Sequence, residues 1–181
     1  EKHIEESLVR LHILANSDSE LDQQLKLRVR DAVLASSDEL FEPYSSSEEA
    51  EEALSGQLDK IKAIADSTLA ENGCDDRTVC EITSMDIDRR EYGEYTVPAG
   101  RYTALRITIG EGKGLNWWCV MYPNMCFSDS MYEVVDKEAG EKLREVLTTE
   151  EYEKVLAEGD YQVRMKYFSW LNPYLEKLAE N

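Results

Sequence analysis

The chain has 181 residues, of which 42% are hydrophobic and 32% charged, a balance that is typical of globular proteins and excludes general disorder. Thirty-eight acidic residues against 20 basic ones give a net charge of −18, which disfavours nucleic acids and anionic membrane surfaces as partners. The length suits one domain over residues 1–181. No apolar run approaches the ~18 residues of a membrane-spanning helix, so we expect no membrane span.

The first strong pattern is a strand. Residues 8–15 alternate with apolar side chains on both faces, with Leu11 and Ile13 on one face and His12 and Leu14 on the other. A strand that is apolar on both faces is typical of the interior of a sheet.

Two helix starts follow this strand. Ser17 and Glu20 have the spacing of a capping box, and apolar side chains then recur at helical spacing up to Val33. A second start at residues 45–49 precedes a long apolar stripe that ends before Gly73, a residue suited to a left-handed C-terminal cap. Together they predict an αα-hairpin.

The middle of the chain has sheet character. Residues 78–88 predict a strand with a bulge near Ser84, and residues 101–109 predict a second strand. Residues 116–122 predict a third strand after the glycine-rich segment 110–115. We expect the last two strands to form a hairpin whose connection is that glycine-rich segment.

Helical patterns return after Lys137. Thr148 and Glu151 again have capping-box spacing, and residues 163–180 place large apolar side chains on one helical face. The expected class is therefore α+β: a mostly antiparallel sheet with a central hairpin, packed by an N-terminal αα-hairpin and C-terminal helices.

The glycine-rich segment invites a phosphate-binding interpretation. Gly110, Gly112 and Gly114 alternate around Lys113, and such loops can present backbone amides to phosphate. A nucleotide site of this kind needs a helix directly after the glycines, whereas a strand follows here. The segment is therefore interpreted as a mobile hairpin tip, and no cofactor is expected.

Cysteine chemistry leaves two interpretations open. Pro123 can turn the chain between Cys119 and Cys126, which would bring the two cysteines within disulfide distance. Alternatively, Cys119 is a nucleophile with His12 as its base and Asn16 or an aspartate as an orienting group. The disulfide is favoured, because no electropositive setting for a reactive thiol is visible in the sequence.

The four cysteines do not have the spacing of a metal site. Cys74 and Cys80 form a C-x5-C pair and Cys119 and Cys126 a C-x6-C pair, both wider than usual zinc-ligand pairs. No metal is expected.

Adjacent tryptophans mark the last predicted strand. Trp117 and Trp118 must point to opposite faces of a strand, so one can enter the core. The other lies under a helix or serves as an exposed anchor for a partner.

Two segments together resemble a known family. Residues 10–34, RLHILANSDSELDQQLKLRVRDAVL, and residues 95–127, YTVPAGRYTALRITIGEGKGLNWWCVMYPNMCF, are similar to the N-terminal and central signatures of the stage II sporulation protein R family. They occur in the right order and at a similar separation. The chain departs from the central signature in having Asn124 after Pro123, where a second proline is frequent.

The resemblance implies a function. Members of that family are signalling proteins of the forespore in endospore-forming bacteria, and they are exported into the space between forespore and mother cell. There they trigger a membrane-embedded aspartic protease that processes a mother-cell sigma-factor precursor. This extracytoplasmic location also favours the Cys119–Cys126 disulfide. The printed sequence starts at Glu1, and we expect it to be a trimmed form without the export segment.

The function expected from these observations is activation of that protease by binding, without catalysis. The candidate partner-binding residues are Lys113, Asn116, Trp117, Trp118, His12 and Asn16. They lie in loop-rich parts of the two signatures that a core does not require. The alternative is a cysteine-dependent hydrolase or transferase that acts on the cell wall with Cys119 and His12.

Overall fold

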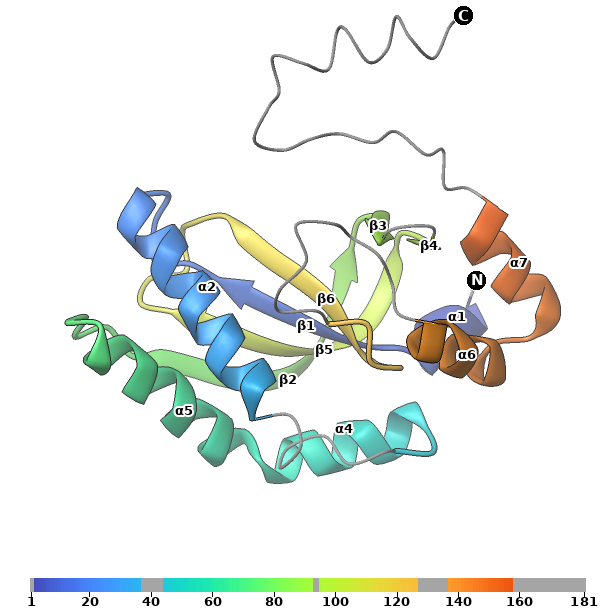
Figure 1. Cartoon of the computed structure of the whole chain (residues 1–181), viewed down its shortest axis with the longest axis horizontal. Coiled ribbons are helices and arrows are strands. Elements are labelled where there is room, and N and C mark those ends of the chain that lie inside the picture. The colour runs from blue at the N-terminus through green and yellow to red at the C-terminus, as the bar shows by residue number, and fades with distance from the viewer. Residues whose placement is uncertain (1, 37–43, 93–94, 127–136, 158–181) are drawn as a thin grey trace, which may run out of the picture.

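A computed structural model describes residues 2–36, 44–92, 95–126 and 137–157. Its centre is a four-stranded sheet in the order β2-β5-β1-β6 (Figure 1). The strands are β1 (Val9–Leu14), β2 (Thr78–Ile87), β5 (Gly100–Ile109) and β6 (Asn116–Tyr122). Two short strands, β3 (Arg90–Tyr92) and β4 (Tyr95–Val97), form a separate ribbon. The α+β class is confirmed.

The predicted hairpin between residues 101–109 and 116–122 is wrong. The strand β1 lies between β5 and β6, parallel to β5 and antiparallel to β6. Every residue of β1 is buried, so this strand needs a partner on each edge and cover on each face. The glycine-rich connection therefore crosses the end of β1: the Lys113 amide donates to the Asn16 carbonyl and the Gly114 amide to the Ala15 carbonyl.

Three of the described helices cover one face of the sheet, which we call the helix face. They are α2 (Glu20–Ala35), α4 (Ser47–Gly56) and α5 (Leu58–Glu71), with α2 and α5 side by side (Figure 1). Their apolar stripes pack on Leu11, Ile13, Leu105 and Ile107 in the larger of two hydrophobic clusters. Burial of these aliphatic side chains is the main stabilising term of this half of the protein.

The helix boundaries refine the sequence prediction. Ser19, rather than Ser17, caps α2 by accepting from the Asp22 amide. Ser46 caps α4, and the long second helix is interrupted at Gly56–Gln57. Gly73 has the predicted left-handed conformation, with a φ of 72°.

The described residues cover the opposite face of the sheet, which we call the open face, only in part. A second cluster packs there under α1 (Lys2–Ser7), α6 (Lys137–Val146), α7 (Thr149–Ala157) and the β3–β4 ribbon. The predicted capping box of α7 is confirmed, since Thr148 and Glu151 bond each other's backbone amides. The helix predicted at residues 163–180 lies outside the described residues.

The predicted bulge near Ser84 is wrong. The register between β2 and β5 is unbroken from Thr78 opposite Ile109 to Ile87 opposite Gly100. The apolar pattern slips because the strand changes the face that it buries. Cys80 and Ile82 pack on the cluster under the helices, whereas Met85 and Ile87 pack on the cluster of the open face.

Candidate functional site

A disulfide joins Cys119 in β6 to Cys126 just after it, with Cα atoms 5.3 Å apart. The chain turns at Pro123 and returns along the strand, so that the Met125 amide donates to the Val120 carbonyl at 2.8 Å. The side chain of Asn124 accepts from the Cys126 amide. The predicted pairing is confirmed, and Asn124 contributes a hydrogen bond to the turn.

The proposed catalytic pair of His12 and Cys119 is not formed. In the pairing of β1 with β6, His12 lies opposite Trp118, and Leu11 lies opposite Cys119. Because successive strand residues point to opposite faces, His12 belongs to the open face and Cys119 to the helix face. The sulfur of Cys119 is also engaged in the disulfide.

His12 instead belongs to a polar row that crosses all four strands of the open face. The row consists of Glu81, Arg106, His12 and Trp118, which the strand pairings place opposite one another. The His12 and Trp118 rings are stacked in parallel planes with centroids 3.7 Å apart. The Nε2 atom of His12 lies 2.6 Å from the side-chain oxygen of Asn116.

Burial lowers the pKa of His12 below its usual value. The hydrogen bond with Asn116 opposes this shift, whereas the positive charges of Arg106 and Arg90 add to it. Burial and the nearby arginine charges both disfavour the imidazolium form. The neutral ring is therefore the favoured partner for stacking on Trp118 at neutral pH.

Arginines surround this row, and sequence analysis missed all of them. Arg10 is fully buried, where its Nε donates to the Cys119 carbonyl at 3.2 Å and its guanidinium lies over the rings of Tyr92 and Tyr102. Arg90, from β3, lies over the Trp118 ring at 5.8 Å. An arginine inside an otherwise apolar strand, as at position 10, was the one available signal, because a buried guanidinium requires partners.

Several donors in this cluster find no hydrogen-bond partner in the part of the chain that the structure describes. They are Nη1 of Arg10, Nε of Arg90, Nε of Arg106 and Nε1 of Trp118, all shielded from solvent. An unsatisfied buried donor costs about 1–3 kcal/mol. Within 4 Å of these three arginines, the described residues supply one carboxylate, that of Glu81, at 3.9 Å from Arg106. The cluster thus has donors and positive charge in excess.

The glycine-rich segment is held at the end of the sheet by Asn16. The Asn16 side chain accepts from the Glu111 amide at 2.9 Å and donates to Asp22 at 3.0 Å. Gly110 and Gly112 have positive φ angles of 55° and 61°. A glycine adopts these angles without strain. The segment is therefore an anchored crossing over β1, and the hairpin-tip interpretation is wrong.

We give the name docking end to four exposed residues: Lys113 and Leu115 of this crossing, Asn116 at the start of β6, and Leu21 in the first turn of α2. Leu21 and Leu115 are each 63% exposed. Helical spacing assigned Leu21 to the apolar stripe of α2, which is wrong, and Leu115 was missed within the glycine-rich segment. Asp18 accepts from the Leu115 amide, which fixes this backbone next to the start of α2. Lys113 pairs with Glu111 on the surface.

The two tryptophans do lie on opposite faces. Trp117 packs against the cluster under the helices, with the Arg30 guanidinium 5.2 Å from its ring. Trp118 lies on the open face, between β1 and the ribbon. Of the six candidate partner-binding residues, Lys113 and Asn116 are exposed and His12 is buried. The other three, Asn16, Trp117 and Trp118, are half-buried.

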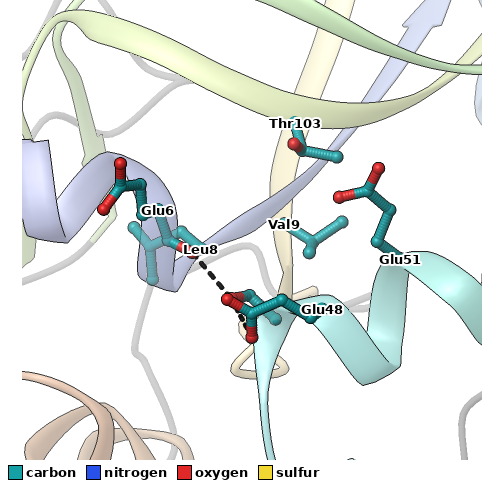
Figure 2. Close-up of a pocket in the computed structure, with 7 residues that line it drawn as sticks. Glu6, Leu8, Val9, Glu48, Glu51 and Thr103 are labelled. Carbon is teal, nitrogen blue, oxygen red and sulfur yellow. Dashed lines mark hydrogen bonds between the residues drawn. The ribbon is translucent and has the colours of Figure 1, made fainter.

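A pocket of ≈ 180 Å³ lies elsewhere, at the start of β1 and α4. Figure 2 shows Glu6 and Glu51 on opposite sides of it, with Leu8, Val9, Ser47, Glu48 and Thr103 completing the lining. The Ser47 hydroxyl donates to the Glu6 carbonyl at 2.6 Å. Across the described parts of the chain, no group of three His, Cys, Asp or Glu residues is placed to hold a metal ion.

None of the described helices is long and apolar enough to cross a membrane.

Comparison with known proteins gives a consistent result. A family profile described as stage II sporulation protein R matches residues 5–132. The stage II sporulation protein R of Bacillus subtilis (strain 168) is 40% identical over 147 residues, which cover 78% of this chain and 66% of that protein. The chain thus spans slightly less than two thirds of that relative's length. No solved structure matches the chain.

Proposed function

Because the chain belongs to the stage II sporulation protein R family and so has a role in sporulation, we propose that it is the exported signal that activates a membrane-embedded aspartic protease. In this proposal the chain acts in the space between forespore and mother cell. The activated protease then processes the precursor of a mother-cell sigma factor. The chain contributes a binding surface and no reacting group.

The observation that carries this proposal is the construction of the docking end. Asn16 and Asp18 hold the backbone of Glu111 and Leu115 in place, and this backbone presents exposed apolar and cationic side chains. A surface that is ordered before binding loses little conformational entropy on binding. Exposed Leu115, two residues after Lys113, provides apolar contact area next to a cationic group, as protein interfaces do.

The cysteine-enzyme alternative has lost its geometric basis. A thiol nucleophile needs a free sulfur and a base within hydrogen-bonding reach. Cys119 is joined to Cys126, and His12 faces the other side of the sheet. These two facts support signalling by binding over thiol catalysis.

The test is a reporter of sigma-factor processing in cells that produce the chain, the protease and the precursor. The variant Lys113→Glu/Leu115→Ser alters exposed side chains only, so the fold is retained and processing is expected to be lost. Lys154→Glu, at an exposed position of α7, is the matched charge control and should process normally. Normal processing with the double variant would contradict the assignment of the docking end.

A further inference from the structure

We propose that Arg90, Arg106 and Trp118 bind the carboxylate of an aspartate or glutamate in a partner protein. The proposal concerns the open face of the sheet, next to the docking end. It rests on the proposed function only in taking a protein as the occupant, and it adds the chemistry that the occupant must have.

The three side chains converge from different strands. Arg106 stands on β5 and Trp118 on β6, with His12 of β1 between them. Two strand spacings separate Arg106 from Trp118, about 10 Å, which two long side chains can bridge above the small imidazole. Arg90 reaches the same place from β3 and lies 5.8 Å from the centre of the Trp118 ring.

The accessibility of the open face increases along its strands towards this group. In the row of Ala104, Arg10 and Val120, every side chain is fully buried. In the next row, Arg106 and Trp118 are partly exposed, and one row further Asn116 is exposed. Val79 of β2 belongs to that last row and is 59% exposed. A partner can therefore approach from the end of the sheet where the docking end lies.

The chemistry of the group selects an anion. Among the described residues, Nε of Arg90, Nε of Arg106 and Nε1 of Trp118 find no hydrogen-bond partner. The one carboxylate within 4 Å among the described residues, that of Glu81, stands 3.9 Å from Arg106, a long distance for an ion pair. Partly exposed guanidinium groups can turn outwards and offer paired donors to a planar carboxylate.

The charge of the whole chain restricts the kind of anion. With a net charge of −18, the protein repels polyanions at long range, so nucleic acids and anionic lipid surfaces are disfavoured. A single carboxylate flanked by neutral or basic residues avoids that repulsion and can still pair with Arg90 and Arg106. An isolated acidic side chain on a protein surface has this character.

The experiment is a titration of the purified chain, observed through the ¹H–¹⁵N signal of the Trp118 indole. The probe is the peptide acetyl-Lys-Ala-Glu-Ala-Lys-amide, and its partner probe carries Gln in place of Glu. We expect a saturable shift of the Trp118 signal with the Glu peptide and an affinity at least tenfold lower with the Gln peptide. The signal is assigned with Trp118→Phe.

Variants separate the site from general charge effects. Arg106→Gln is expected to lower the affinity for the Glu peptide at least tenfold. Arg90→Gln provides the same test from a different strand. Arg101→Gln is the matched control, because Arg101 is on the same strand as Arg106 but on the other face, and it should bind like wild type. The backbone amide spectrum verifies the fold of each variant.

Three outcomes would overturn the proposal: equal affinity for the Glu and Gln peptides, unchanged affinity in folded Arg106→Gln and Arg90→Gln, or an equal response to inorganic phosphate. The titration contains no protease. Its failure therefore leaves the reporter result for Lys113→Glu/Leu115→Ser intact, and failure of that reporter leaves the peptide result intact.

Discussion

His12 and Cys119 stand on adjacent strands and face opposite sides of the sheet. The register places Trp118, and not Cys119, opposite His12. The pair that would have formed a thiol active site is thus divided between two different environments. Cys119 closes a turn beneath the helices, and His12 contributes to a cationic and aromatic group on the open face.

Loss of the disulfide should destabilise the protein without abolishing its fold. Closure of the loop between Cys119 and Cys126, seven residues apart, is expected to contribute about 2.5 kcal/mol through the entropy of the unfolded chain. Chemical denaturation of Cys119→Ala/Cys126→Ala measures this loss. Cys74→Ser, at an unbridged cysteine, serves as the control. Equal stability of the double variant and wild type would contradict a structural role for the bond.

Asn16→Ala should release the glycine-rich crossing. The variant loses the hydrogen bonds to the Glu111 amide and to Asp22, at an expected cost of about 1–3 kcal/mol. Hydrogen exchange at residues 110–115 should become faster than in wild type. Glu111→Ala keeps the backbone amide that Asn16 binds and should retain protection. Unchanged exchange in Asn16→Ala would show that other contacts hold this segment.

Two glycine substitutions should differ in their effects. A Cβ atom on Gly114 would lie 2.2 Å from the backbone oxygen of Ser17, so Gly114→Ala forces the crossing away from the α2 start and should cost about 1–3 kcal/mol. Gly56, at the end of α4, has no atom within 4 Å of such a Cβ. Gly56→Ala should leave stability unchanged or raise it by up to about 1 kcal/mol. Thermal unfolding compares the two, and similar effects would refute the tight approach at Gly114.

His12 should make stability dependent on pH below its usual pKa of about 6.5. Burial lowers the pKa in the folded protein, so the unfolded chain binds the proton first as the pH falls. The free energy of unfolding should therefore decrease from about pH 6.5 down to the lower folded pKa. Denaturation across this range should give a flatter profile for His12→Asn.

Asn116→Ala is the control for this effect. It removes the hydrogen bond that opposes the lowered pKa of His12, so the pH dependence should persist and extend to lower pH. A profile for His12→Asn as steep as that of wild type would assign the effect to other groups.

Much of the fold was predictable because each element depends on local periodicity. The alternation at residues 8–15 predicted an inner strand, and β1 is one. Strand order was not predictable in the same way, because the pattern of a strand identifies its faces but not its neighbours. Residues 101–109 and 116–122 are close in sequence and looked like a hairpin, whereas a strand from the N-terminal region separates them.

The candidate site, like the fold, was predictable only in part. The disulfide followed from the spacing of two cysteines around Pro123. The arginines did not, since Arg90 and Arg106 in short polar patterns resemble ordinary surface residues. Only the register of four strands and the placement of the ribbon bring them to Trp118.

Cleavage of the sigma-factor precursor by the purified protease in proteoliposomes tests the central claim most directly. The chain is added in increasing amounts, as wild type or as Lys113→Glu/Leu115→Ser. The concentrations are kept above the dissociation constant. If the chain activates by stoichiometric binding, the cleavage rate should rise in proportion to the amount of wild-type chain until chain and protease are equimolar. The double variant should give no rise. Full activation by a small fraction of an equivalent, or by the double variant, would contradict activation through the docking end.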